Sequence, residues 1–164
     1  MSVQREDVGR PDWDEYFLGL AIAVSVRSHD PRTKHGCIIT HQNRIVGTGY
    51  NGYIHGVDDN SLPKKAPEKY KVFFHAETNA LLNCHIRPEG CIAYVTGESC
   101  LSCMQQLWQA GIKEVVYLNR HGSFNITDED RAMKKLLVNQ TGMILKPYTG
   151  VIDWVLLNSS SSSS

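Results

Sequence analysis

The sequence predicts an α/β fold, a three-layer α/β/α sandwich built around a mixed five-stranded sheet. Three observations support this fold class: a first segment with helical periodicity, two β-branched runs that indicate a hairpin, and a second half in which strands alternate with helices. Elements in this order favour helices packed on a sheet. Because 164 residues are most simply one domain with a proper core, we expect a single domain over residues 1–157. Residues 158–164 contain only Asn and Ser and are expected to form a disordered tail without function.

The first helix is expected over residues 13–27, where apolar side chains recur at steps of three and four. Asp12 is a suitable N-cap, and the sequence His-Asp-Pro at 29–31 ends the helix. Runs rich in β-branched residues follow at 36–40 and 45–48, with polar residues between them, so we expect a β-hairpin. Residues 50–74 then lack clear periodicity, and a loop of this length in a compact domain is usually functional or mobile.

The second half of the chain alternates between the two kinds of element. Helices are expected at 75–84, 101–110 and 128–139, and strands at 91–96, 114–118 and 143–146. Gly111 occupies the position where a helix commonly ends, and Thr127 is a suitable N-cap followed by acidic residues.

Charge and composition exclude several classes of protein. Lys and Arg together number 17, as do Asp and Glu, so the chain lacks the basic excess of a general nucleic-acid binder. This balance favours a small-molecule substrate over a polynucleotide, although a local basic patch would be compatible with it. No apolar run is long enough to span a membrane, and the N-terminus lacks the apolar region of a signal peptide. With five cysteines and no secretory signal, free thiols or metal ligands in a reducing cytoplasm are expected.

The most informative feature is His75-Ala76-Glu77 followed by Cys100 and Cys103. An imidazole and two thiols give zinc three protein ligands, which leaves a fourth position for water and marks a catalytic rather than a structural site. Both cysteines fall at the start of a predicted helix, where the helix dipole and a metal lower the pKa of a thiol. Two buried structural cysteines would be the plain alternative, but His75 ahead of another helix start favours the metal site.

Glu77 is the expected proton carrier of this site. On an ideal helix His75 and Glu77 would point about 200° apart, so both reach one place only if His75 lies at the irregular helix start. In that arrangement Glu77 would take a proton from water, give it to the ring nitrogen of a base and protonate the departing amine. The plain alternative is an exposed carboxylate at a helix start.

At these residues the chain resembles the cytidine deaminase superfamily, and within it the deoxycytidylate (dCMP) deaminases. The order His-x-Glu followed by Cys-x-x-Cys is the signature of the zinc nucleobase deaminases. The resemblance extends over residues 13–145 and includes Arg-Ser-His-Asp-Pro at 27–31, Gly-Tyr-Asn-Gly at 49–52, His-Ala-Glu-Thr-Asn-Ala at 75–80 and Gln-Ala-Gly-Ile-Lys-Glu-Val at 109–115. The zinc motif indicates only the superfamily. The segments at 27–31 and 49–52 narrow the resemblance to the dCMP deaminases.

The resemblance implies a cytidine deaminase-like fold and hydrolysis of dCMP to dUMP, which supplies thymidylate synthesis. It also implies a homohexamer, activation by dCTP and inhibition by dTTP, with Mg²⁺ on the triphosphate. The implied sites are zinc ligands His75, Cys100 and Cys103, proton carrier Glu77, substrate-binding residues Arg27, Asn51, Ala76 and Tyr117, and regulatory residues Gly49, Tyr50, Asn51 and Gly52.

Two residues depart from the family pattern. Ser99 replaces the proline that usually precedes the first cysteine, and we expect its hydroxyl to cap the helix instead. His35 occupies a position that is more often apolar. A second zinc in the long loop is not expected, since residues 50–74 contain only His55 and no cysteine.

Several polar groups allow more than one interpretation. The basic run at Lys64, Lys65, Lys69 and Lys71 is expected to form a solvated face, or else to attract an anionic nucleotide. The Asp58-Asp59 pair is expected to solubilise a turn rather than bind metal. The other cysteines, Cys37, Cys84 and Cys91, are expected to be small buried hydrophobic residues. Ordinary surface positions are expected for His29, His41, His85 and His121.

Two other functions compete with dCMP deamination. A tRNA adenosine or free-nucleobase deaminase would share the zinc chemistry, but the neutral charge and the 49–52 segment count against tRNA. A catalytically silent nucleotide sensor would retain zinc for structure alone, and the intact Glu77 counts against it.

Overall fold

The computed structural model describes residues 9–119 and 126–155. Its helices are α1 (Trp13–Ser25), α2 (Ala76–Leu82), α3 (Leu101–Gln109) and α4 (Asp128–Thr141). Its strands are β1 (Gly36–His41), β2 (Arg44–Tyr50), β3 (Ile92–Val95), β4 (Glu114–Leu118) and β5 (Ile144–Tyr148). Every expected element is present, with bounds that differ from expectation by at most a few residues. Among the described residues, no helix combines the length and apolar character needed to cross a membrane.

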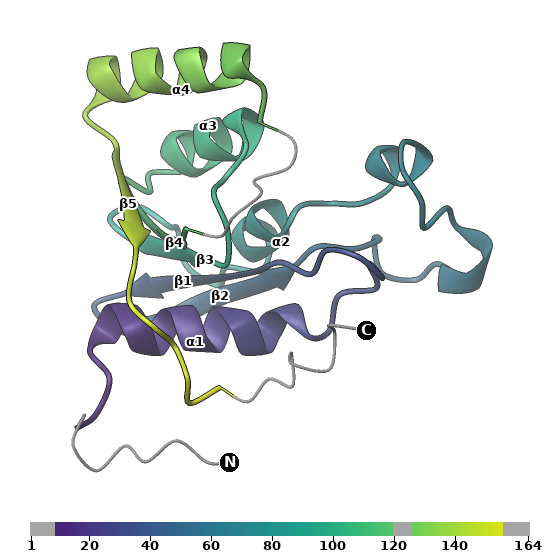
Figure 1. Ribbon diagram of the computed structural model, residues 1–164, viewed down its shortest axis with the longest axis horizontal. Coiled ribbons are helices and arrows are strands. Elements are labelled where there is room, and N and C mark those ends of the chain that lie inside the picture. Colours follow the sequence, from purple (N-terminus) through teal and green to yellow (C-terminus); the bar gives the residue numbers. More distant parts are fainter. Residues whose placement is uncertain (1–8, 120–125, 156–164) are drawn as a thin grey trace.

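The five strands form one mixed sheet in the order β2-β1-β3-β4-β5. Strand β1 pairs antiparallel with both β2 and β3, whereas β3, β4 and β5 run parallel. Helix α1 covers one face of the sheet, and α2, α3 and α4 cover the other (Figure 1). The expected three-layer α/β/α sandwich is confirmed.

The core is divided by the sheet into two clusters. Phe17 and Leu18 of α1 pack with Ile38, Tyr94 and Val116 on one face. On the other face, Met104 and Leu107 of α3 pack with strand residues that include Ile39, Val95 and Val115. Neighbouring residues of one strand alternate between the clusters, as the two-residue period of a strand requires.

The pairing directions bring one end of three strands to the same edge of the sheet. Because β1 is antiparallel to its two neighbours, Gly36 at its start pairs with Tyr50 at the end of β2, and Cys37 pairs with Val95 at the end of β3. Helix α3 begins shortly after β3 ends, so its N-terminus lies at this edge. We call it the strand-end edge; it carries the candidate site.

Helix α2 is fixed against this edge by a close approach to β2. A side chain at Gly49 would collide with the backbone of α2 at Ala80 N and at Ala76 O, the latter at 2.5 Å. Asn79 Nδ2 also donates to Tyr50 O at 2.8 Å. The absence of a Cβ at Gly49 therefore allows the first turn of α2 to pack directly on the end of β2.

The long segment between β2 and α2 has more structure than its sequence indicated. It contains 3₁₀ turns at Asp59–Ser61 and Glu68–Lys71, and Gly52 forms an isolated antiparallel bridge with Phe74. Asp58 accepts a hydrogen bond from Asn60 N and so caps the first of these turns, in agreement with the turn expected there.

Lys69 contradicts the solvated face expected for the basic run. Its side chain is buried, and Nζ lies 2.9 Å from Asp30 Oδ2. A buried charge requires a partner, and Asp30 comes from a segment far away in sequence. The other lysines of the run, Lys64, Lys65 and Lys71, are exposed, as expected.

Most of the remaining expectations for histidine and cysteine are met. Cys37 and Cys91 are buried and Cys84 is half-buried, all as free thiols. His29 is exposed, as expected, and it also has specific contacts, because Nε2 lies 2.7 Å from Asp59 Oδ2 and its ring stacks on Tyr53. The predictions for His121 and for residues 158–164 lie outside the described residues.

Candidate metal centre and active site

Three ligand atoms converge where the first turns of α2 and α3 meet at the strand-end edge. His75 Nδ1 lies 3.4 Å from Cys100 Sγ and 3.2 Å from Cys103 Sγ. All three ligand atoms lie within 4.8 Å of one another. Zinc bonded tetrahedrally to nitrogen at ~2.0 Å and to sulfur at ~2.3 Å would place its nitrogen and sulfur ligands about 3.5 Å apart. The spacing of the three atoms therefore fits one zinc ion and leaves one corner of the tetrahedron free.

Local backbone structure explains how these side chains meet. His75 is the N-cap of α2 and has an extended backbone (φ −74°, ψ 154°), so it lies just outside the helix. This is the irregular helix start that the sequence argument required for His75 and Glu77 to serve one site. Cys100 is likewise the N-cap of α3, with Cys103 one turn into the helix, so both thiols lie on one face.

The ionisation of the two thiols favours a bound cation. The Cys103 thiol and the His75 imidazole hold the pKa of Cys100 well below its usual range. A hydrogen bond to Cys100, together with burial, raises the pKa of Cys103. A divalent cation would stabilise both thiolates, which is the state in which cysteine binds metal.

Glu77 occupies the first turn of α2 and is only 6% exposed. Burial raises the pKa of its carboxyl, and the neighbouring Cys100 contributes to the rise, while Ser99 and His75 oppose it. A raised pKa favours the protonated form of a carboxyl, so Glu77 is suited to carry a proton. Its burial contradicts the plain alternative of an exposed carboxylate.

Ser99 does not act as the helix cap that the sequence predicted. The cap of α3 is the Cys100 sulfur, which accepts a hydrogen bond from Cys103 N at 3.4 Å. The Ser99 hydroxyl is buried and has no hydrogen-bond partner of standard geometry among the described residues. It nevertheless lies close enough to the Glu77 carboxyl to lower its pKa.

Asn51 and His35 join two segments at the strand-end edge. Asn51 Oδ1 accepts a hydrogen bond from His35 N at 2.8 Å, and its Nδ2 donates to Thr33 O at 2.9 Å. His35 Nδ1 lies 3.3 Å from Thr96 Oγ1, so its ring contacts the end of β3. Asn51 therefore fixes the segment before β1, and His35 joins that segment to the strand that leads to Cys100.

The other predicted substrate residues lie in different surroundings. Ala76 is the buried first residue of α2, next to His75 and Glu77. Arg27 is exposed and lies over the Tyr50 ring at 5.8 Å. Tyr117 is half-buried in β4, where burial and the charge of Glu98 raise the pKa of its hydroxyl. The structure thus brings Ala76 to the His-Cys-Cys cluster and Arg27 to the 49–52 segment, whereas Tyr117 lies beside Glu98.

A group of charged residues that contacts the two residues before Cys100 was not singled out from the sequence. Lys134 of α4 is buried, and its Nζ donates to Glu98 Oε1 at 2.9 Å and to Ser99 O at 2.7 Å. Arg131 also pairs with Glu98, at 3.2 Å. The available signal was the spacing of Arg131 and Lys134, three residues apart on one helix face, together with an acidic residue two positions before Cys100.

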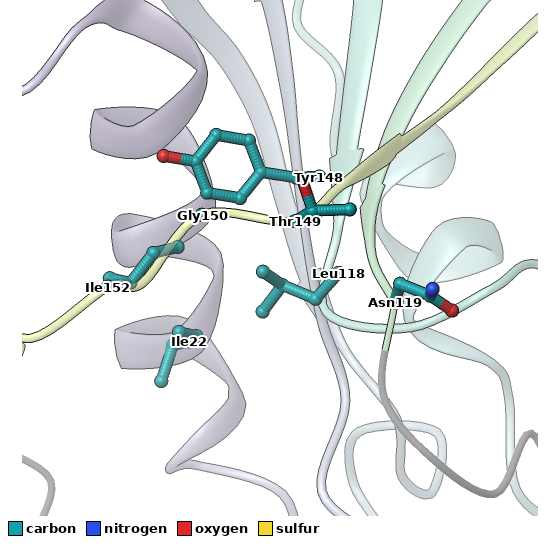
Figure 2. Close-up of a pocket in the computed structure, with 7 residues that line it drawn as sticks. All are labelled: Ile22, Leu118, Asn119, Tyr148, Thr149, Gly150 and Ile152. Atoms are coloured by element: carbon teal, nitrogen blue, oxygen red, sulfur yellow. The ribbon is translucent and has the colours of Figure 1, made fainter.

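A cavity of about 340 Å³ lies away from this cluster. It opens at the ends of β4 and β5, where Leu118 and Tyr148 face Ile22 of α1 (Figure 2). Leu118 and Tyr148 pack with the α1 core cluster, whereas the His-Cys-Cys cluster lies beside α2 and α3 on the other face. The cavity lining has no ionisable group other than the Tyr148 hydroxyl, so the reactive chemistry belongs to the cluster.

Comparison with known proteins agrees with this geometry. The family model described as "Cytidine and deoxycytidylate deaminase zinc-binding region" matches residues 11–119. The chain is 36% identical over 161 residues to a protein named deoxycytidylate deaminase from Homo sapiens, covering 90% of this chain and 89% of the human protein. It is 39% identical over 124 residues to the deoxycytidylate deaminase of Mycobacterium phage D29, covering 67% of this chain and 97% of the phage protein.

Solved structures confirm the fold. The dCMP deaminase of cyanophage S-TIM5 in its apo form superposes with a TM-score of 0.65 at 24% identity, over 85% of this chain and 99% of that one. The same phage protein in complex with dCMP and dUMP gives a TM-score of 0.64.

Proposed function

The chain belongs to the cytidine and deoxycytidylate deaminase family, and we propose that it is an enzyme that hydrolyses dCMP to dUMP and ammonia. The observation that carries this proposal is the convergence of His75, Cys100 and Cys103 beside the buried carboxyl of Glu77. The relatives named deoxycytidylate deaminase, one of which is similar over nine tenths of this chain, support dCMP as the substrate. In this proposal residues 1–157 act as one catalytic domain, and the product dUMP supplies thymidylate synthesis.

His75, Cys100 and Cys103 are the proposed zinc ligands. A zinc ion held by these three ligands would lower the pKa of a bound water to roughly 7. Since two thiolates balance the charge of Zn²⁺, the site would be neutral before that water ionises. Because the first turns of α2 and α3 bring all three donors to the strand-end edge, these residues would hold the ion and leave room beside it for water and substrate.

Glu77 is the proposed proton carrier. It would accept a proton from the attacking water and deliver it to the ring nitrogen beside the amine-bearing carbon. It would then protonate the departing amine, so that ammonia leaves as the carbon–nitrogen bond breaks. The backbone N–H of Ala76, in the first turn of α2, has no partner within its helix and is the proposed contact to the pyrimidine.

Arg27, Asn51 and Tyr117 are the proposed nucleotide-binding residues. Asn51 lies at the strand-end edge, where its side chain joins the 49–52 segment to the residues before β1. Arg27 offers an exposed guanidinium for phosphate, and Tyr117 offers a hydroxyl at the end of β4.

Regulation by nucleotides is proposed for residues 49–52, with dCTP as activator, dTTP as inhibitor and Mg²⁺ on the triphosphate. Gly49 packs on the first turn of α2, and Tyr50 O accepts a hydrogen bond from Asn79 of the same helix. A nucleotide that moves this segment would therefore move the helix that presents Glu77. We also propose a homohexamer, in which exposed apolar side chains such as Leu82, Met133 and Leu136 are available for contacts between copies of the chain. The five free cysteines support a reducing, cytoplasmic location.

The decisive experiment measures ammonia release from dCMP by zinc-loaded protein, alone and with dCTP·Mg²⁺ or dTTP·Mg²⁺. Turnover that is raised by dCTP and lowered by dTTP supports the reaction, the substrate and the regulation together. Turnover that neither nucleotide changes supports the reaction and contradicts the regulation. With one zinc per chain and no turnover under any condition, the dCMP assignment is wrong, and tRNA adenosine and free bases become the substrates to test.

A further inference from the structure

We propose that Lys134 is a positioning residue for the zinc site, whose buried ammonium group fixes the backbone immediately before Cys100. The inference rests on the proposed zinc site. It assigns a role to a residue of α4, a helix that supplies none of the proposed ligands.

The contacts of Lys134 converge on the two residues that precede the first cysteine. Its Nζ donates to Ser99 O at 2.7 Å and to Glu98 Oε1 at 2.9 Å. The Ser99 carbonyl belongs to the peptide unit that joins Ser99 to Cys100. The ammonium group is therefore bonded to the backbone one peptide unit away from a proposed metal ligand.

Burial raises the free-energy cost of losing either of these hydrogen bonds. The Lys134 side chain is 6% exposed and that of Glu98 is 18% exposed. A lysine at this depth is rarely tolerated unless its donors are satisfied. Breaking such an interaction from one side leaves the partner groups without compensation.

The anchor for these bonds is a packed helix. Leu137 and Val138 of α4 pack against the core cluster beneath α2 and α3. Thr127 caps the N-terminus of α4 by accepting a hydrogen bond from Asp130 N at 3.1 Å. The position of Lys134 is thus fixed by side chains other than its own. Lys134 can therefore fix the position of the backbone at Ser99.

The identity of residue 99 gives a reason for such an anchor. The signature of the zinc deaminases has proline before the first cysteine, and proline fixes its own φ and restricts the residue before it. Ser99 supplies neither restriction, and its hydroxyl does not cap α3. We infer that Lys134 supplies through two hydrogen bonds the restriction that proline would supply through its ring.

Arg131 provides a matched control on the same helix. It also pairs with Glu98, but its side chain is 48% exposed, whereas the hydrogen bond to Ser99 O comes from the buried Lys134. Exposed ion pairs contribute little to stability. If the Ser99 contact is what matters, removing the charge of Arg131 will have a far smaller effect than removing that of Lys134.

The test measures zinc affinity by competition with a chromophoric chelator, together with the absorption spectrum of the Co²⁺-substituted protein. The proteins are the wild type, Lys134→Met, Arg131→Met, Ser99→Pro and the double variant Ser99→Pro/Lys134→Met. Thermal unfolding of each metal-free protein is measured in parallel. Within the part of the chain that the structure describes, Ser99 N–H donates no hydrogen bond, so proline at this position removes no bond to those residues.

We expect Lys134→Met to weaken zinc binding about ten- to a hundred-fold, as for other residues that orient metal ligands, and to alter the Co²⁺ spectrum. Arg131→Met is expected to stay within about threefold of the wild type. The double variant is expected to bind zinc at least about fivefold more tightly than Lys134→Met alone, because proline restores the missing restriction.

Two results would overturn the inference. One is a zinc affinity for Lys134→Met equal to that of the wild type, whatever its thermal stability, since Lys134 would then be structural only. The other is a double variant no better than Lys134→Met. If Lys134→Met fails to fold, Lys134→Gln, whose shorter side chain cannot span both partners, is judged by the same comparisons. A wild type that binds no zinc would instead contradict the proposed function itself.

Discussion

Lys69 Nζ lies 2.9 Å from Asp30 Oδ2, and both side chains are almost fully buried. The other Asp30 oxygen accepts hydrogen bonds from Arg32 N and Thr33 N. The ion pair joins the long segment after β2 to the connection between α1 and β1. Asn51 Nδ2 also donates a hydrogen bond to Thr33 O in the same connection. The hydrogen bond and the ion pair together hold the 49–52 segment and the loop beyond it to the rest of the fold.

Loss of this ion pair should destabilise the protein. Lys69→Met leaves the Asp30 carboxylate buried without a cation, and we expect the free energy of unfolding to fall by about 3–5 kcal/mol, measured by urea unfolding. Lys71→Met, at an exposed position two residues away, is the control and should change stability by less than about 0.5 kcal/mol. Equal effects of the two substitutions would show that the buried pair is not a source of stability.

The same pair predicts how stability depends on pH. The Lys69 ammonium and the two backbone N–H donors hold the pKa of Asp30 below its usual range in spite of burial. A carboxyl with a lowered pKa in the folded state stabilises the fold above its unfolded pKa of about 3.9, and this contribution is lost as pH falls through the folded pKa. We expect the wild type to lose stability more steeply than Asp30→Asn as pH falls from about 5 to 3. Parallel curves for the two proteins would contradict this assignment.

Glu77 should be needed for turnover but not for metal binding. Replacing it with Gln keeps the size of the side chain and removes its proton-transfer capacity, so we expect kcat for dCMP to fall by about 10²–10⁴-fold. Zinc content should stay near one per chain, since three other residues are the proposed ligands. Glu129→Gln, at an exposed position in the first turn of α4, is the control. A Glu77→Gln protein with normal kcat would refute the proton-carrier role.

Removal of one thiol should release the metal. Cys103→Ala takes away one of the three converging ligand atoms, and we expect zinc content to drop to a small fraction of that of the wild type. Cys84→Ala, at a half-buried free thiol outside the cluster, should retain zinc. Metal analysis after dialysis distinguishes the two. Retention of zinc by Cys103→Ala would mean that the ion is bound elsewhere.

The close contact between Gly49 and α2 predicts a position-specific effect of a single methyl group. Gly49→Ala would collide with the α2 backbone at Ala76 and Ala80, and we expect loss of stability together with weakened zinc binding. At Gly52 the nearest atom is His29 Nδ1 at 3.3 Å, a side-chain atom that can shift. Gly52→Ala should therefore be much milder by thermal unfolding and zinc titration. Similar behaviour of the two variants would contradict the proposed contact.

The sequence by itself determined the local features of this protein. Helical and strand periodicity, the cap at Thr127 and the polar hairpin turn depend on neighbouring residues, and all of these agree with the structure. The metal ligands were also accessible, because Cys100 and Cys103 share a helix face through their spacing alone. Their common site with His75 could be inferred because His-x-Glu followed by Cys-x-x-Cys is the signature of a zinc site.

Only the tertiary structure decided the contacts between distant segments. Burial of Lys69, which the sequence placed on a solvated face, depends on Asp30, and the anchoring of Ser99 depends on Lys134 of a helix that follows much later. The failure of Ser99 to cap α3 has a local origin instead, since the sulfur of the adjacent Cys100 occupies the cap position. A lone lysine or serine carries no local signal of its partner, because the free energy of burying a polar group depends on which groups the fold brings within hydrogen-bonding distance.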